Sequence, residues 1–266
     1  KFDPVKFRWI GSPELSNRVC IVMKESKIKK GADLFTHQAL MGGAGAGTAV
    51  STTPNVLRTL LGMKFKLIEG YKSATDVSLA MERGEVEGIC QSYGAFKAGH
   101  PDWLKSGRVR VLFNLEPNPI AGTNIPSVFE HVKTDEQRKI LSFYSSNIEI
   151  GRPTVAPPGI SSTRLNTLRR AFDATMGDAK FIAAAKKQGL KVSPLTGEEQ
   201  EKRVLALAAT DPVTVKKTEA MLNRLNPSFT ETVKVTGTKR KGRRVLFMKK
   251  GKSITIKVSK SRTKVS

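Results

Sequence analysis

Residues 70–88 constrain the fold most, because they place a loop, a capped helix and the start of a strand in immediate succession. Ser73 is followed three positions later by Asp76, which resembles a capping box and predicts that a helix starts here. Gly84 stands where a glycine in the left-handed conformation ends many helices. Residues 86–90 are then predicted to form the next strand.

The same alternation continues on the amino-terminal side of this segment. Residues 18–24 are rich in β-branched side chains without a breaker, which predicts a buried strand. Thr53 followed by Pro54 predicts a helix start, with threonine as the cap and proline at the first helical position. Residues 65–68 are the next predicted strand. Strands and helices that alternate in this way are typical of parallel α/β structure.

The second half of the chain extends this pattern. Residues 109–113 are predicted to form a strand, and Thr134, Asp178 and Thr196 each stand at a predicted helix start. One face of a long helix between two of these starts carries apolar residues at helical spacing: Leu165, Leu168, Phe172 and Met176. The expected fold class is therefore α/β over most of the chain.

The last part of the chain differs in character. Residues 244–248 and 253–258 are rich in β-forming residues, and 249–252 have the composition of a turn, which predicts a hairpin. Of the 46 basic residues, 13 lie from position 232 onward, where no acidic residue occurs. We expect 232–266 to be a basic β-hairpin extension appended to the α/β body.

The net charge of +23 raises the question of nucleic-acid binding. All 23 acidic residues lie before residue 232. The same part of the chain has 33 basic residues and therefore a net charge of +10. A strongly basic tail on a moderately basic body is commonly a solvated surface. Specific nucleic-acid binding is not expected, and polyanion binding through the tail stays as an alternative.

The two cysteines, Cys20 and Cys90, lie in apolar contexts and belong to no Cys-x-x-Cys pair. Buried free thiols are the favoured interpretation. A single disulfide formed in an oxidising compartment remains open, because pairing cannot be deduced from sequence.

Signals of an enzyme are weak. His37, His100 and His131 are isolated, without metal-ligand spacing, so no metal site is expected. The chain has no Gly-x-Ser-x-Gly elbow for a nucleophile. A binding protein without a cofactor is the favoured class. An α/β enzyme that acts on a carboxylated or phosphorylated small molecule is the alternative.

The glycine-rich segment 42–48 is the first candidate for ligand binding. It is no P-loop, because no Gly-Lys-Ser or Gly-Lys-Thr follows, and no dinucleotide fingerprint fits its spacing. Glycines let a backbone turn its N–H groups toward a ligand, and a helix amino-terminus favours an anion. A purely structural turn is the alternative. The predicted contacts are Gly45, Ala46, Gly47 and Thr48.

Two further segments are candidates for ligand binding, and the one after residue 90 follows a predicted strand end, where α/β sheets usually bind ligands. The loop before residue 75 offers a capping serine and first-turn N–H groups that can face a carboxylate, although a cap alone is the simpler interpretation. A weaker signal comes from the polar residues after residue 90 and from a serine near the amino-terminus. The predicted contacts are Tyr71, Ser73, Ala74, Gln91, Ser92 and Ser12.

Several segments, in their order and spacing, resemble the substrate-binding receptors of tripartite tricarboxylate transporters. These are the Bug-type periplasmic solute-binding proteins, a branch of the type 2 periplasmic binding proteins. The resemblance covers residues 2–225, and the segments that carry it are 7–12, 42–48, 70–88, 107–112, 155–159 and 168–176.

The resemblance implies a two-lobe α/β fold that closes on its ligand. Residues 1–24 with 151–231 would form the first lobe, and 25–150 the second. Receptors of this kind begin upstream with further strands of the first lobe, which have no counterpart in this sequence, so a partial first lobe is expected. The basic extension lies outside the resemblance.

The resemblance also implies a function. The chain would be a monomeric periplasmic receptor that captures a small carboxylate, either a di- or tricarboxylate or an aromatic acid. Its partners would be that ligand and the membrane components of a tripartite tricarboxylate transporter. The ligand carboxylate would be held by backbone N–H groups of the glycine-rich loops and by helix amino-termini.

Overall fold

The computed structural model describes residues 3–120, 122–190, 192–225, 239–240 and 243–244. The chain divides into two compact units, Lys1–Leu225 and Asn226–Ser266. In the second unit, β9 (Lys239–Arg240) pairs antiparallel with β10 (Arg243–Arg244). Apart from Arg244, the predicted hairpin strands 244–248 and 253–258 lie outside the described residues. The remaining elements all belong to the first unit.

The larger sheet has five strands in the order β4-β3-β5-β2-β6. Strand β3 is parallel to β4 and β5, whereas β2 runs antiparallel to both of its neighbours, β5 and β6. The predicted parallel arrangement therefore holds for the predicted strands 65–68 and 86–90, which are both parallel to β3, and is wrong for the predicted strand 18–24, which is β2. The sheet as a whole is mixed. Its strands are β2 (Arg18–Met23), β3 (Ala39–Gly42), β4 (Phe65–Ile68), β5 (Gly88–Ser92) and β6 (Val109–Asn114).

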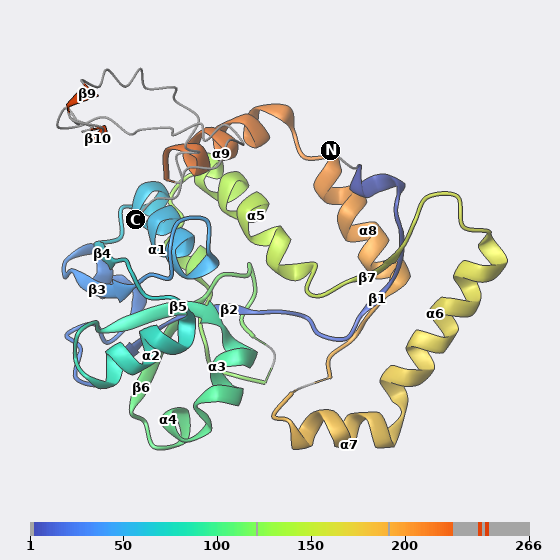
Figure 1. The fold of residues 1–266 in the computed structure, drawn as a ribbon, viewed down its shortest axis with the longest axis horizontal. Helices are drawn as coiled ribbons and strands as arrows, with labels where there is room; N and C mark the ends of the chain where they lie inside the picture. The colour runs from blue at the N-terminus through green and yellow to red at the C-terminus, as the bar shows by residue number, and fades with distance from the viewer. Residues whose placement is uncertain (1–2, 121, 191, 226–238, 241–242, 245–266) are drawn as a thin grey trace. The chain divides into compact units, whose positions relative to one another are not determined.

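Helices cover both faces of this sheet (Figure 1). On β2, Cys20 and Val22 belong to the core beneath α1 (Ala49–Leu61), α5 (Asp135–Glu149) and α9 (Pro212–Leu225). Val19 and Ile21, which alternate with them, belong to the core beneath α2 (Ala74–Glu82), α3 (Tyr93–Gly99) and α4 (Pro101–Lys105). This alternation follows from the period of two in a strand. Because both faces of β2 are covered by apolar core, residues 18–24 do not alternate between apolar and polar side chains.

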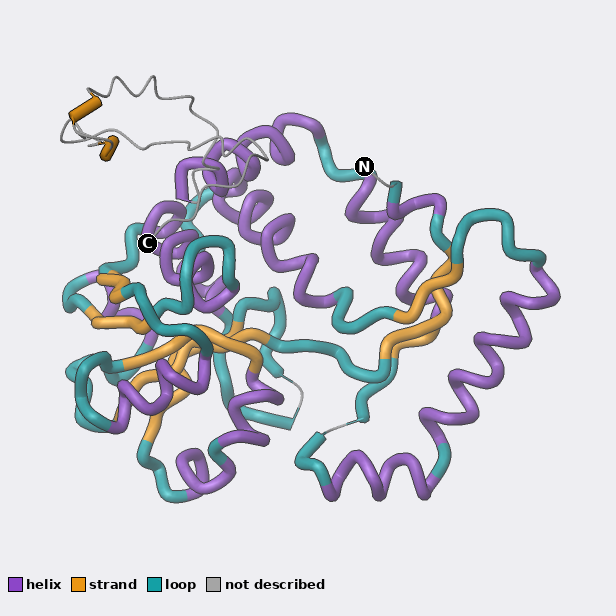
Figure 2. Tube along the Cα trace, viewed as in Figure 1, coloured by secondary structure: helices purple, strands orange, loops and turns teal. Residues whose placement is uncertain are grey.

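A smaller sheet has three antiparallel strands in the order β7-β1-β8 (Figure 2). Ile10 on β1 packs with Ala156 and Leu165 in a separate small core, which Phe172 borders. A Cβ added at Gly11 would lie 2.3 Å from the Phe172 ring, so only glycine fits there. The elements are β1 (Arg8–Ser12), β7 (Thr154–Ala156), β8 (Leu195–Thr196), α6 (Ser162–Gly177), α7 (Ala179–Lys187) and α8 (Gly197–Ala208).

Short 3₁₀ helices complete the first unit at Pro4–Lys6, Gly31–Phe35 and Val128–His131. Within the described part of the chain, no helix combines the length and apolar character that crossing a bilayer requires.

The expected start of the first long helix is wrong. Helix α1 begins at Ala49, and Thr48 is its cap: the Thr48 hydroxyl oxygen accepts a hydrogen bond from the Ser51 N–H at 3.3 Å. Pro54 lies inside the helix. Thr48 ends the glycine-rich loop in an extended conformation, which suits a cap, so the helix starts five residues earlier than the threonine–proline pair predicts.

Cys20 and Cys90 form a disulfide, so the expectation of free thiols is also wrong. The two residues lie opposite each other in the register of β2 and β5, with Cα atoms 4.0 Å apart and no exposed surface. Residues opposite each other in antiparallel strands point to the same face. The pairing could not be seen from sequence because it depends on the direction of β2.

Replacing both Cys20 and Cys90 by alanine is expected to lower the free energy of unfolding by about 2–4 kcal/mol. The bond joins positions separated by 70 residues, and cross-linking a long loop restricts the unfolded chain. Urea denaturation followed by circular dichroism, without reductant, measures the loss. Wild-type protein unfolded with reductant should approach the double variant, and an unchanged stability of the variant would contradict the expectation.

Candidate functional site

The carboxyl ends of β3, β4 and β5 meet at one edge of the larger sheet, because these strands are parallel. The chain leaves β3 for α1 on one face and leaves β4 for α2 on the opposite face. Neighbouring strands whose connections depart to opposite faces define the place where open α/β sheets bind ligands. The loops 43–48 and 69–73 lie there, so the topology brings two predicted ligand loops to one edge.

The glycine-rich loop adopts the conformation that its glycines permit. Gly45 and Gly47 have φ angles of 95° and 81°, in the left-handed region, and a Cβ on either would meet no atom within 4 Å. The Gly45 N–H donates to Glu69 Oε2 at 2.9 Å, and the Ser51 hydroxyl donates to the same oxygen at 2.9 Å. An acidic side chain of this protein therefore already engages the predicted anion loop.

The other predicted residues of this loop have mixed roles. Ala46 and Gly47 are exposed at its tip. The Thr48 hydroxyl donates to the Gly45 carbonyl at 2.8 Å, and its oxygen caps α1. Both of these hydrogen bonds are structural. Sequence reasoning missed Glu69, because a carboxylate that returns to a loop more than twenty residues earlier leaves no local pattern.

The second predicted loop is tied to its own helix. The Ser73 hydroxyl oxygen accepts from the Asp76 N–H at 3.2 Å, so the predicted cap of α2 is confirmed. The Tyr71 hydroxyl donates to Glu85 at 3.1 Å, and burial together with this bond raises the pKa of Tyr71. Tyr71 and Ala74 border the apolar core under α2.

Gln91 is almost fully buried on β5, opposite Val19 of β2. Ser92 caps α3, since its hydroxyl oxygen accepts from the Ala95 N–H at 3.3 Å. Ser12 is fully buried at the end of β1, a strand of the smaller sheet.

Ser12 joins two segments that connect the sheets. Its hydroxyl donates to the Glu14 carbonyl at 2.9 Å and accepts from the Arg152 N–H at 3.0 Å. Residues 13–17 link β1 to β2, and residues 150–153 link α5 to β7. Ser12 thus joins the two linkers where they pass between the sheets. Its bond to the Arg152 N–H fixes the position of the Arg152 backbone.

A hollow of about 380 Å³ lies beside this junction. Its walls come from the linker before β2, from the start of α3 and from the segments around Gly122, Arg152 and Leu190. The charged and polar side chains that line it include Glu14, Asn17, Tyr93, Lys97, Arg152 and Lys186. Tyr93 directly follows the end of β5, so the hollow shares the sheet edge with the predicted loops.

The charge of this hollow favours an anion. Three cationic side chains line it against the single carboxylate of Glu14. Arg152 is exposed, and its guanidinium makes no hydrogen bond or ion pair with any residue that the structure describes. Lys97 lies 5.5 Å from the centre of the Tyr93 ring. Burial raises the pKa of Tyr93 further above its usual range. The phenol is protonated at neutral pH and can donate a hydrogen bond.

None of the cationic residues of the hollow was predicted from sequence. Lys97, Arg152 and Lys186 come from three distant segments, and only the folded chain brings them together. Each one alone is indistinguishable in sequence from an ordinary solvated side chain.

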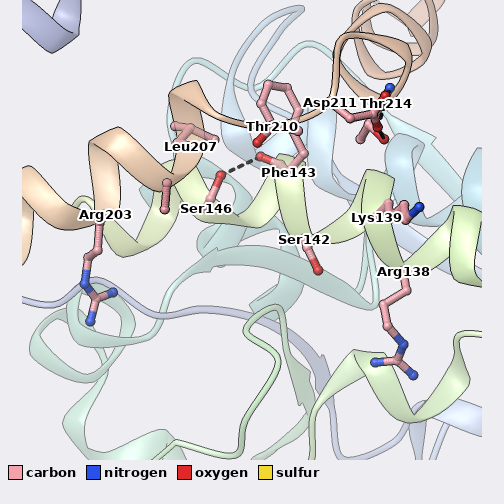
Figure 3. A pocket seen from close by; sticks show the side chains of 11 residues that line it. Arg138, Lys139, Ser142, Phe143, Ser146, Arg203, Leu207, Thr210, Asp211 and Thr214 are labelled. Atoms are coloured by element: carbon pink, nitrogen blue, oxygen red, sulfur yellow. Dashed lines mark hydrogen bonds between the residues drawn. The ribbon is translucent and has the colours of Figure 1, made fainter.

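A second hollow of about 480 Å³ lies between α5 and the end of α8 (Figure 3). Phe143 and Leu207 line it, and the Ser146 hydroxyl donates to the Phe143 carbonyl at 2.7 Å. No predicted site residue borders it. Across the described ranges, no group of His, Cys, Asp and Glu side chains is placed to hold a metal ion.

No protein-family model and no curated protein matches the sequence. Among solved structures, the chain is similar to a TctC solute-binding protein from Polaromonas, with 17% identity and a TM-score of 0.61, over 84% of this chain and 72% of that one. An R. palustris protein with adipate gives 15% identity and a TM-score of 0.53, over 84% and 71%. The periplasmic binding protein BugD gives 16% and 0.51, over 83% and 71%. The predicted periplasmic-binding-protein-like α/β fold is confirmed.

Alanine at Gly151 is expected to disturb the junction between the linkers. Gly151 has a φ of 67°, and an added Cβ would lie 2.3 Å from the Glu14 carbonyl oxygen and 2.9 Å from the Ser12 hydroxyl. Gly107 has a φ of 66° but no atom within 4 Å of such a Cβ. We expect Gly107→Ala to cost about 1 kcal/mol and Gly151→Ala about 2–4 kcal/mol. Urea denaturation compares them, and equal losses would show that the clash is relieved without cost.

Proposed function

We propose that this chain is an extracytoplasmic receptor that captures a small carboxylate for a tripartite tricarboxylate transporter. The cationic hollow beside the carboxyl ends of the parallel strands carries this proposal. The cations Lys97, Arg152 and Lys186 surround a space large enough for a small organic acid. The ligand class is a di- or tricarboxylate or an aromatic acid, and the R. palustris protein of similar fold was determined with adipate.

In the proposed complex, the Arg152 guanidinium binds one carboxylate of the ligand. Its planar fork can donate two parallel hydrogen bonds to a carboxylate. Lys97 and Lys186 add positive charge, and the Tyr93 phenol adds a donor. Leu15, Ile120 and Leu190 provide apolar wall for the carbon chain of the acid.

The predicted loops complete the proposed site. The loops 45–48 and 71–74 lie at the same sheet edge, and in the proposed complex their backbone N–H groups would hold a second carboxylate. Gln91 and Ser92 lie at the end of the strand between these loops and the hollow. Ala44, Tyr71, Ala74 and Tyr93 all border one apolar core, which supports the closeness of the two regions.

Binding rather than catalysis is supported by the fold neighbours, which are described as solute-binding or periplasmic binding proteins. The disulfide between Cys20 and Cys90 supports a periplasmic location, since such bonds persist in oxidising compartments. We further propose that the receptor acts as a monomer and delivers its ligand to the membrane components of the transporter.

A thermal-shift screen against mono-, di- and tricarboxylates and aromatic acids, with adipate included, tests the proposed function. A ligand at about 100 times its dissociation constant should stabilise the fold by about 2.7 kcal/mol. The diamide of the same acid should give no shift, because it lacks the charge that the cations attract. Equal stabilisation by acid and diamide would refute carboxylate recognition.

Arg152→Gln is expected to weaken adipate binding about tenfold or more, because a charge-assisted hydrogen-bond pair is lost. Arg164→Gln is the matched control: it removes the same charge from an exposed position on α6, outside the hollow. Isothermal titration calorimetry at two salt concentrations measures both. An equal loss in the two variants would mean that only overall charge matters.

A further inference from the structure

Glu69 follows β4 directly and reaches back to the glycine-rich loop. One oxygen, Oε2, accepts from the Gly45 N–H and from the Ser51 hydroxyl, both at 2.9 Å. A Cβ added at Gly43 would lie 2.6 Å from the same oxygen and 2.8 Å from the Ser51 hydroxyl. The absence of a side chain at Gly43 therefore makes the room in which this carboxylate sits.

The place that Glu69 occupies is defined by the topology. It lies between the outgoing connections of β3 and β4, which lead to α1 and α2 on opposite faces of the sheet. It also lies by the first turn of α1, where backbone N–H groups carry partial positive charge. These features favour an anion, and in this structure the anion is a side chain of the protein.

We propose that Glu69 is a specificity-determining residue that competes with the ligand for the glycine-rich loop. This inference rests on the proposed function. While Glu69 holds the donors of Gly45 and Ser51, a carboxylate of the ligand gains no contact from them. A dicarboxylate must displace Glu69 before its second carboxylate reaches the loop, so its affinity is lowered relative to that of an acid that binds only in the hollow.

Two properties make Glu69 suited to this role. It is tethered one strand away from the loop, so its effective concentration at these donors is high. It is also exposed, and its side chain can swing into solvent without burying a charge. The competition is therefore strong but reversible.

The test compares adipate affinity, by isothermal titration calorimetry, in wild type and three variants. Glu69→Ala vacates the loop and is expected to bind adipate about tenfold more tightly. Glu69→Gln removes the charge but keeps an oxygen that can accept from Gly45 and Ser51, so a smaller gain is expected. Glu25→Ala is the control. It removes an exposed acid just after the carboxyl end of β2, at the sheet edge opposite the glycine-rich loop, and should leave adipate affinity within about twofold of wild type.

Nuclear magnetic resonance locates the effect. The Gly45 amide resonance should respond to adipate in Glu69→Ala at concentrations that leave it unchanged in wild type. Equal gains in adipate affinity in Glu69→Ala and Glu69→Gln would show that only the charge of Glu69 matters. That result would overturn the proposed competition for the donors of Gly45 and Ser51. Equal affinities in wild type and Glu69→Ala would overturn this inference alone. Absence of binding by all four proteins to every acid of the panel would overturn the proposed function together with it.

Discussion

The antiparallel position of β2 between β5 and β6 is the constraint on which the rest of the structure depends. Alternate residues of β2 fill both cores of the larger sheet, so its register fixes the helices on each face. Its amino end continues directly from the linker after β1, so β2 carries one of the connections to the smaller sheet. The disulfide of Cys20 locks β2 to β5, the strand whose end borders the cationic hollow.

Local features were predictable from sequence because their causes are local. Ser73, Thr134 and Thr196 cap helices as expected, since each side chain acts on an amide only three residues away. The start of α1 was misplaced because two threonines compete as caps, and conformation rather than composition decides between them. The parallel direction of β4 and β5 followed from the helix between them, whereas β3 was not predicted as a strand and the predicted strand 18–24, which is β2, runs antiparallel to its neighbours.

Long-range features were beyond sequence reasoning for a common physical reason. Pairing of Cys20 with Cys90, the return of Glu69 to Gly45 and the gathering of cations around Arg152 each depend on residues far apart in the chain. Nothing in the neighbouring residues distinguishes such side chains from solvated ones. The two predicted loops lie at one edge of the sheet, but the charges of the neighbouring hollow emerge only from the fold.

The hydroxyl of Ser12 has a mechanical consequence. Because one buried oxygen bonds both the segment after β1 and the segment before β7, the two crossings cannot slide past each other without losing a shielded hydrogen bond. The serine therefore ties the two linkers to each other at one shielded point, next to the Arg152 backbone.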